Sequence, residues 1–334
     1  MTARAPRPEP SARPPAAAVE ERVLSAALAL QRLSWEQGVL GHALRDLGRH
    51  DLANLVADDA VVRQDDDGRL GEVDGGGLVN CGALVEVVAD LAARTGEPRL
   101  REALDRQRHW LLAGCPRAGD GTLFHLTGSE QVWVDSVYMV VPALLRLGHP
   151  EEALRQLRGH RDRLRAPSGL WSARHDEPTG RLVQAASWGT GNGWVAAGLA
   201  RAWREPRALP HRAELAAEAR SVVEACLRHR RPDGLFHDVV DDPTTFVEAN
   251  LAQMLAYAVL TGVHDGWLGP GWAEVGRDLR AAAARGVGED GLVRPVPGSP
   301  SFDRPGRSVE AQTFFLLAAV AERRLDEGRG VRGR

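Results

Sequence analysis

The segment Gln131-Val-Trp-Val-Asp-Ser-Val-Tyr-Met-Val-Val-Pro142 places one carboxyl group, that of Asp135, among aromatic and apolar side chains. Apolar neighbours desolvate a carboxyl group and raise its pKa from about 3.9 toward neutrality. A carboxylic acid that keeps its proton near neutral pH can act as a general acid. Asp is also a favoured N-cap residue, so Asp135 could instead cap the helix that runs to Leu147. This segment by itself leaves both roles open.

Five other segments of the same kind occur along the chain. Each carries polar or acidic side chains and opens an apolar run, rich in Ala and Leu, with helical periodicity. Most of these runs stop at a glycine, as in Leu47-Gly48 and Thr261-Gly262, which suits a helix C-cap. The six segments are Ser34-Trp-Glu-Gln-Gly38, Val79-Asn-Cys-Gly82, Val132-Trp-Val-Asp-Ser136, Trp188-Gly-Thr-Gly-Asn-Gly-Trp194, Phe246-Val-Glu-Ala-Asn250 and Ser308-Val-Glu-Ala-Gln312.

A second helix with a more polar face follows each apolar run, for example over 97–112, 150–164, 211–229 and 272–285. The repeating unit is therefore an αα-hairpin, which recurs at intervals of 45 to 62 residues. Six such hairpins can close into an all-α (α/α)6 barrel, whose inner helices all begin at one mouth. Short β-hairpin loops with a Gly-x-Leu/Phe pattern are expected to rim that mouth. An open solenoid would have the same helices but no shared mouth.

A shared mouth would bring together side chains that are far apart in the sequence. Tryptophan rings there would serve as platforms for sugar rings, and the converging helix N-termini would favour an anionic ligand. His175 and His237 are expected on loops at the rim of the mouth, where contact with a ligand and simple exposure to solvent are equally open. The expected ligand-contacting residues are Trp35, Gln37, Asn80, His125, Trp133, Met139, His175, Trp188, Asn192, Trp194, His237, Glu248 and Gln312.

The composition is that of one large helical domain. The chain has 334 residues, of which 43% are hydrophobic, and we expect the domain to span 18–326. Residues 1–17 are rich in Pro, Arg and Ala and predict a disordered tail, and 327–334 are expected to form a short C-terminal tail. The absence of a signal-peptide-like apolar region and of any membrane-spanning run predicts a cytoplasmic protein without a membrane partner.

Charge and cysteine content exclude several kinds of partner. A net charge of −3 gives no reason to expect nucleic acid. Cys81, Cys115 and Cys226 lack metal-ligand spacing, which predicts reduced thiols and no bound metal. Gly189-Thr-Gly-Asn-Gly193 could be taken for a nucleotide-binding loop, but no strand precedes it and no Gly-Lys-Ser/Thr follows. A tight turn that approaches a ligand is the better interpretation.

Four of these motifs together resemble glycoside hydrolase families 105 and 88. They are the Gln131–Pro142 segment, Trp188-Gly-Thr-Gly-Asn-Gly-Trp194, Phe246-Val-Glu248 and Glu310-Ala-Gln312, and the resemblance extends from about 19 to 324. It implies a six-hairpin barrel that removes an unsaturated uronyl residue from small oligosaccharides made by polysaccharide lyases, without a metal or organic cofactor. Asp135 matches the general acid/base of the family, which protonates C4 of the C4=C5 vinyl ether, after which water adds at C5.

Two positions depart from the family pattern. The second acidic residue of the family stands three residues before the match to Asn80, and this chain has Gly77 there, with Asp74 as a nearby substitute. The arginine of the family's Trp-Gly-Arg is replaced by Thr190. If the substrate is a uronide, its carboxylate then needs another donor. The candidates nearest in sequence are Arg174, Arg304 and Arg307.

Two other functions compete with the hydrolase. Sugar 2-epimerases use the same barrel with paired histidines on inner helices, but none of the six segments contains a histidine. A helical repeat that binds a partner protein should present an extended face of mixed charge. In this chain Trp, Asn, Gln and acidic residues gather at helix starts instead. The hydrolase is therefore the preferred prediction.

Overall fold

The computed structural model describes residues 16–332, in which α-helices alternate between an inner and an outer layer. The inner helices are buried almost all round, whereas the outer helices bury one stripe. The outer helices are α1 (Ala16–Leu30), α3 (His50–Val62), α5 (Pro98–His109), α7 (Pro150–Leu164), α9 (Arg212–Leu227) and α11 (Trp272–Ala284). The inner helices are α2 (Ser34–Asp46), α4 (Val85–Thr95), α6 (Ser136–Arg146), α8 (Gly189–Arg204), α10 (Asn250–Asp265) and α12 (Val309–Arg332).

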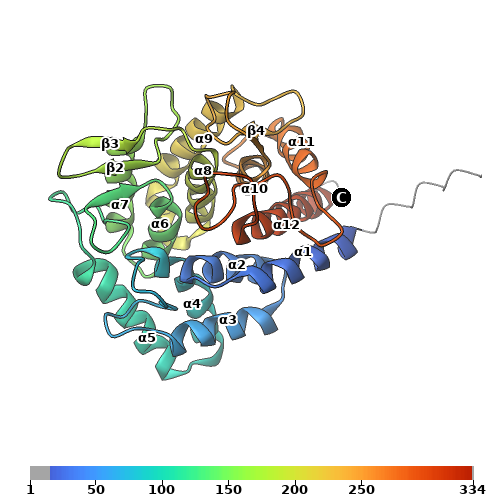
Figure 1. Ribbon diagram of the computed structural model, residues 1–334. Helices are drawn as coiled ribbons and strands as arrows, with labels where there is room; N and C mark the ends of the chain where they lie inside the picture. The colour runs from blue at the N-terminus through green and yellow to red at the C-terminus, as the bar shows by residue number, and fades with distance from the viewer. Residues whose placement is uncertain (1–15, 333–334) are drawn as a thin grey trace, which may run out of the picture.

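The inner helices form a closed ring. Each inner helix contacts the next one along the chain, and α12 contacts α2, which closes the ring. The short 3-10 helix η1 (Asn80–Leu84) precedes α4 and contacts both α2 and α6. Helix α1 packs on α12, so the first helix of the chain is the outer partner of the last (blue and red in Figure 1). This ring confirms the expected (α/α)6 barrel.

Two small antiparallel sheets lie just before inner helices. The first pairs β1 (Gln131–Trp133) with β2 (Arg174–Asp176) and β2 with β3 (Arg181–Gln184), and its register sets Trp133 opposite Arg174. The second pairs β4 (Phe236–His237) with β5 (Val247–Glu248). Because β1 leads into α6 and β5 into α10, these strands fix where the two helices begin.

Several buried amide side chains hold glycine-containing turns that join one hairpin to the next. In each case the side-chain oxygen accepts the backbone N–H of a turn residue at 2.8 or 2.9 Å, which satisfies a buried donor. The pairs are Gln107 with Leu70, Gln156 with Leu123, Asn192 with Trp171, and Gln312 with Val293. The turns are thereby anchored to the barrel around its circumference.

The boundaries of the domain differ from those predicted. Helix α1 begins at Ala16, so residues 16 and 17 are helical, while the rest of the expected tail, 1–15, lies outside the described residues. Helix α12 continues to Arg332, through most of the expected tail at 327–334. Extending a formed helix is easy because each added residue gains a backbone hydrogen bond without new nucleation.

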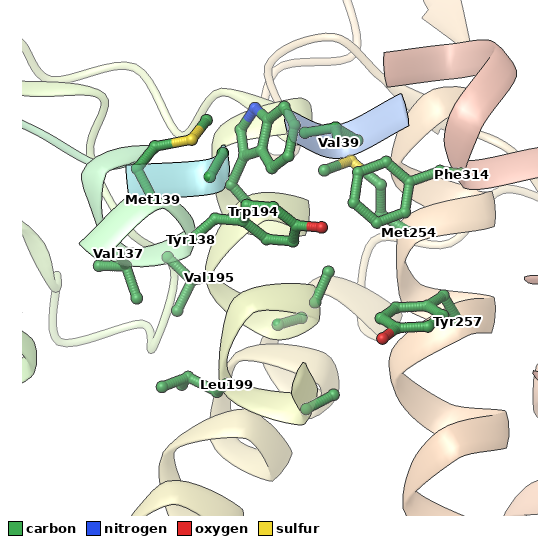
Figure 2. Packing of buried hydrophobic residues seen from close by; sticks show 14 of the residues in the cluster. Val39, Val137, Tyr138, Met139, Trp194, Val195, Leu199, Met254, Tyr257 and Phe314 are labelled. Carbon is green, nitrogen blue, oxygen red and sulfur yellow. The ribbon is translucent and has the colours of Figure 1, made fainter. Parts of the chain in front are cut away.

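Aromatic side chains from three inner helices meet in the centre of the barrel (Figure 2). The ring of Trp194 lies 4.7 Å from that of Tyr138 and 5.3 Å from that of Phe314, both edge to face. Such contacts add to the stabilisation that burial of the rings provides. Within residues 16–332, no helix has the length and apolar character required to cross a membrane.

A buried ion network joins all six inner helices in the interior of the ring. The guanidinium of Arg201 on α8 donates to Glu86 on α4 at 2.8 Å, lies 3.4 Å from Asp46 on α2 and donates to the hydroxyl of Tyr257 on α10. Burial opposes ionisation of Glu86, but Arg201 and its neighbours outweigh it, so the pKa of Glu86 is well below its usual range.

Two further contacts complete the network. The ring of His42 on α2 lies between Glu86 and the Tyr138 hydroxyl, 2.8 Å from the latter, which brings in α6. Burial lowers the pKa of His42 to about 3, so the ring is neutral. Arg324 of α12 lies 3.3 Å from Asp46.

Replacing Arg201 should destabilise the barrel strongly. The Arg201→Met change keeps the volume but leaves Glu86 and Asp46 buried with less compensation, which is expected to cost about 3–5 kcal/mol of unfolding free energy. Arg204→Met on the same helix is the control, because its partly exposed pair with Asp265 is worth about 1 kcal/mol or less. Urea unfolding measures both. Equal destabilisation by the two changes would contradict the role given to Arg201.

Candidate active site

A cavity of about 550 Å³ opens where the inner helices begin. Its wall draws on the starts of α2, α6 and α12 and on the loops between hairpins. Most of the residues expected at the mouth line it, although they come from distant parts of the chain. These are Trp35, Asn80, His125, Trp133, Asp135, Met139, Trp188 and Trp194.

Three predicted amide residues do not line the cavity. Gln37 is turned toward α3, where its amide faces Asp59 and its oxygen accepts a hydrogen bond from Arg63. Asn192 and Gln312 are fully buried and hold the turns described above. Their hydrogen bonds are made within the protein, so these side chains are structural.

The loop histidines His175 and His237 also lie outside the cavity wall. His175 sits within β2, with its Nδ1 3.6 Å from Glu177. The two ring nitrogens of His237 lie 2.8 Å from the carbonyl oxygen of Thr245 and 2.9 Å from the guanidinium of Arg231. Each histidine therefore faces a local partner in its own loop.

Glu248, which was also expected at the mouth, is buried beneath it. Its carboxyl accepts the backbone N–H groups of Asn250 and Leu251, the latter at 3.0 Å, and so caps helix α10. Burial raises the pKa of Glu248 to about 8, against the effect of these backbone hydrogen bonds. Glu248, the acidic residue of the fifth segment, thus stabilises the start of helix α10.

Asp135 occupies the N-cap position of α6, yet its side chain makes no capping hydrogen bond. Its Oδ1 has no hydrogen-bond partner among the described residues, and its Oδ2 lies 3.7 Å from His125 Nε2. The carboxyl group instead borders the cavity with about 18% of its side chain exposed. The helix-cap role is therefore not observed.

His125 and Trp133 support this carboxyl group. The two rings stack with centroids 4.6 Å apart and planes 6° from parallel. His125 Nδ1 lies 2.9 Å from the hydroxyl of Ser136, which fixes the ring with Nε2 toward Asp135. Burial lowers the pKa of His125, although Asp135 opposes the shift, so the imidazole is neutral at neutral pH.

Arg174 is the one Arg or Lys that lines the cavity in the described part of the chain. Its guanidinium lies 3.7 Å from the centroid of the Trp133 ring, a cation–π contact fixed by the pairing of β1 with β2. Burial lowers the pKa of Arg174, and the Asp135 carboxylate opposes this. Arg304 and Arg307, the other candidates, are exposed and do not line the cavity.

The structure shows what surrounds Gly77 and Thr190, the two positions that depart from the family pattern. A Cβ atom at Gly77 would lie 2.8 Å from Asn80 Nδ2, so Asn80 occupies the space of the missing side chain. Asp74 lines the cavity beside Glu72, whose pKa is raised by burial and by Asp74. Thr190 is fully buried and accepts a hydrogen bond from Asn250, away from the cavity.

Three further cavity residues were not among the predicted ones. Glu310 lies in the sixth segment, two residues before the predicted Gln312, and Asp238 directly follows the predicted His237. Burial raises the pKa of Asp238 to about 6 and that of Glu310 to about 8. Phe302 has a left-handed backbone, with φ of 58°, in a loop that has no hydrophobic periodicity.

No group of three or more His, Cys, Asp or Glu side chains within 16–332 is arranged to hold a metal ion. The three cysteines are buried free thiols, and burial raises the pKa of Cys115 to about 12. The polar side chains that line the cavity carry carboxyl, amide and hydroxyl groups, one imidazole, one guanidinium and indoles. This set suits acid/base chemistry on a polyhydroxylated ligand.

The sequence is similar to the unsaturated rhamnogalacturonyl hydrolase YesR of Bacillus subtilis (strain 168). The two are 27% identical over 217 residues, which cover 60% of this chain and 61% of YesR. The match thus spans less than two thirds of the length of that relative.

Solved structures share the fold over nearly the whole chain. A possible member of the GH105 family from Salmonella enterica serovar Paratyphi A superimposes with a TM-score of 0.77 at 19% identity, covering 96% of this chain and 97% of that one. The unsaturated glucuronyl hydrolase of Bacillus sp. GL1 gives a TM-score of 0.65 at 14% identity, covering 90% and 88%. At these identities the likeness concerns the fold.

The family itself is given by the sequence. Residues 29–301, most of the barrel and its cavity, match the family model described as Glycosyl Hydrolase Family 88. The chain therefore belongs to Glycosyl Hydrolase Family 88 and is a glycoside hydrolase.

Proposed function

We propose that this enzyme removes an unsaturated uronyl residue from oligosaccharides produced by polysaccharide lyases. Two similar proteins, an unsaturated rhamnogalacturonyl hydrolase and an unsaturated glucuronyl hydrolase, support this class of substrate. The observation that carries the proposal is the position of Asp135. Its carboxyl borders the cavity, is not used as a helix cap, and lies beside a neutral imidazole and a guanidinium.

Asp135 acts as the general acid. It gives its proton to C4 of the C4=C5 vinyl ether, and the positive charge that develops at C5 is shared with the ring oxygen. Water adds at C5 and returns a proton to the Asp135 carboxylate, which restores the acid. The hemiketal at C5 then opens to a ketone, and the hemiacetal left at C1 releases the aglycone sugar. The glycosidic oxygen is not protonated in the first step, unlike in a two-carboxylate glycosidase.

His125 is assigned as a positioning residue for that carboxyl. If Ser136 donates its hydroxyl proton to Nδ1, Nε2 carries the ring proton and points at Asp135 from 3.7 Å. That distance exceeds a hydrogen bond, but catalytic hydrogen bonds often shorten once substrate is bound. A neutral donor there stabilises the carboxylate after proton transfer without adding a permanent charge.

Arg174 is assigned to the uronate carboxylate. A guanidinium binds a carboxylate through two parallel N–H groups, and the Trp133 ring keeps the Arg174 fork in one orientation. Because Thr190 is turned away from the cavity, Arg174 takes over the cationic contact that the family arginine would make. The carboxylate at C5 and the reacting C4 would then both lie on the α6 side.

The competing functions have less support. A 2-epimerase would need paired histidines in the cavity, and His125 is the single histidine among the described lining residues. A helical repeat for protein binding would present an extended groove, whereas this ring encloses a cavity of about 550 Å³.

Asp135→Asn should lower kcat by at least about a hundredfold, because the amide has nearly the same shape but cannot deliver a proton. Loss of the ultraviolet absorbance of the double bond measures turnover of lyase-generated disaccharides. Thermal unfolding should be nearly unchanged, since the side chain caps nothing. Asp105→Asn on the outer helix α5 is the matched control and should keep full activity. Retained turnover in Asp135→Asn would contradict the assignment.

Arg174→Gln should raise KM for an unsaturated uronide by about tenfold or more and change kcat less. The charge-assisted contact is present in both ground and transition states, so its loss is a loss of uniform binding. Arg304→Gln serves as the control, because that side chain is 82% exposed and away from the cavity. Steady-state kinetics of both variants test the assignment. An unchanged KM in Arg174→Gln would show that Arg174 does not bind the carboxylate.

A further inference from the structure

The cavity is bordered by two further acidic side chains, Glu310 at the start of α12, opposite Asp135, and Asp238 beside the start of α8. In the ring order α2, α4, α6, α8, α10, α12, the helices α6 and α12 stand three places apart and therefore face each other across the barrel. Asp135 directly precedes α6, and Glu310 lies in the first turn of α12. Two carboxyl groups thus border the same cavity from opposite walls.

Glu310 is fully buried and lines the cavity, and neither of its carboxyl oxygens meets a hydrogen-bond partner of good geometry within residues 16–332, although the nearby Ser308 hydroxyl acts to lower its pKa. Its acidic neighbour Glu36 is occupied, because it accepts the backbone N–H groups of Arg32 at 2.7 Å and Leu33 at 3.0 Å. A buried carboxyl without partners is costly, so such a group suits a ligand that supplies them.

Asp238 also borders the cavity, beside the start of α8. It is 8% exposed, lines the cavity, and its Oδ1 is also without a partner among the described residues. Its backbone is held in place, since its carbonyl oxygen accepts the N–H of Gly189 at the start of α8, at 2.6 Å. We refer to Asp238 and Glu310 as the carboxyl pole.

Aromatic rings stand beside the carboxyl pole. The Phe302 ring lies 6.3 Å from that of Trp35 and 5.9 Å from that of Trp188, and all three line the cavity. Backbone hydrogen bonds from Phe302 to Gly298 and from Gly298 to Arg304 hold the loop in its left-handed turn. Flat apolar faces next to carboxyl groups match a sugar, which carries C–H faces and hydroxyl edges.

We propose that Asp238 and Glu310 bind hydroxyl groups of the sugar that carries the unsaturated uronyl residue, and that they select a neutral sugar over an anionic one there. The inference rests on the proposed function, which places the uronyl ring between Asp135 and Arg174 on the α6 side. The rest of the substrate then extends across the cavity to the carboxyl pole. Hydroxyl groups satisfy the free carboxyl oxygens, whereas a sulfate or second uronate would meet a like charge on the Asp238 carboxylate.

Two lyase-generated disaccharides with the same unsaturated uronyl residue, one on a neutral hexose and one on a sulfated hexose, test the proposal. The wild-type enzyme should prefer the neutral disaccharide by at least about tenfold in kcat/KM. The double variant Asp238→Asn/Glu310→Gln keeps the shapes but removes the Asp238 charge and both carboxyl groups, and should reduce that preference by at least about fivefold. Glu218→Gln, a buried carboxyl on α9 outside the cavity, is the control and should leave the preference unchanged.

Turnover with the same preference in wild type and double variant would overturn the carboxyl pole while leaving the proposed function intact. Turnover of neither disaccharide would instead contradict the proposed function. In that case a binding measurement tests the carboxyl pole independently of turnover. A neutral, saturated disaccharide is titrated by calorimetry into Asp135→Asn and into Asp135→Asn/Glu310→Leu. An increase in Kd of at least about tenfold on adding Glu310→Leu supports the pole, and an equal Kd overturns it.

Discussion

The guanidinium of Arg201 is the interaction on which the rest of the structure depends. It lies in the interior of the ring and pairs with Glu86 and Asp46, and through His42, Tyr257 and Arg324 the same network reaches every inner helix. These charges are buried, so they tolerate little displacement of the helices that carry them. With the inner helices tied together in this way, their first turns converge around one cavity.

The convergence of helix starts explains how a small set of side chains forms two chemically distinct walls. On the α6 side, pairing of β1 with β2 sets Arg174 over Trp133, and His125 stacks on Trp133 with Nε2 toward Asp135. Elsewhere on the wall, Glu310 at the start of α12 and Asp238 beside the start of α8 border the cavity together with aromatic rings. A substrate with a charged, reactive ring at one end and a hydroxyl-rich sugar at the other would fit this division.

The repeat pattern was sufficient to predict the barrel and the position of Asp135, because helix periodicity and capping signals are local properties of the sequence. Side-chain direction at the helix starts was harder to predict. Successive helical residues are rotated by about 100°, so Glu310 lines the cavity while Gln312 points into the core to hold a turn. Asn192 and Glu248 likewise meet backbone partners. Phe302 and Asp238 depend on loop conformations that have no periodic signal.

Protonation of C4 by Asp135 is the central claim, and turnover in deuterium oxide tests it most directly. Nuclear magnetic resonance of the released uronyl product should show one deuterium at C4 for each turnover, because the proton that Asp135 delivers has exchanged with solvent. The Asp135→Asn variant should form no such product. A product formed without deuterium at C4, or the same labelled product from Asp135→Asn at the wild-type rate, would contradict the account.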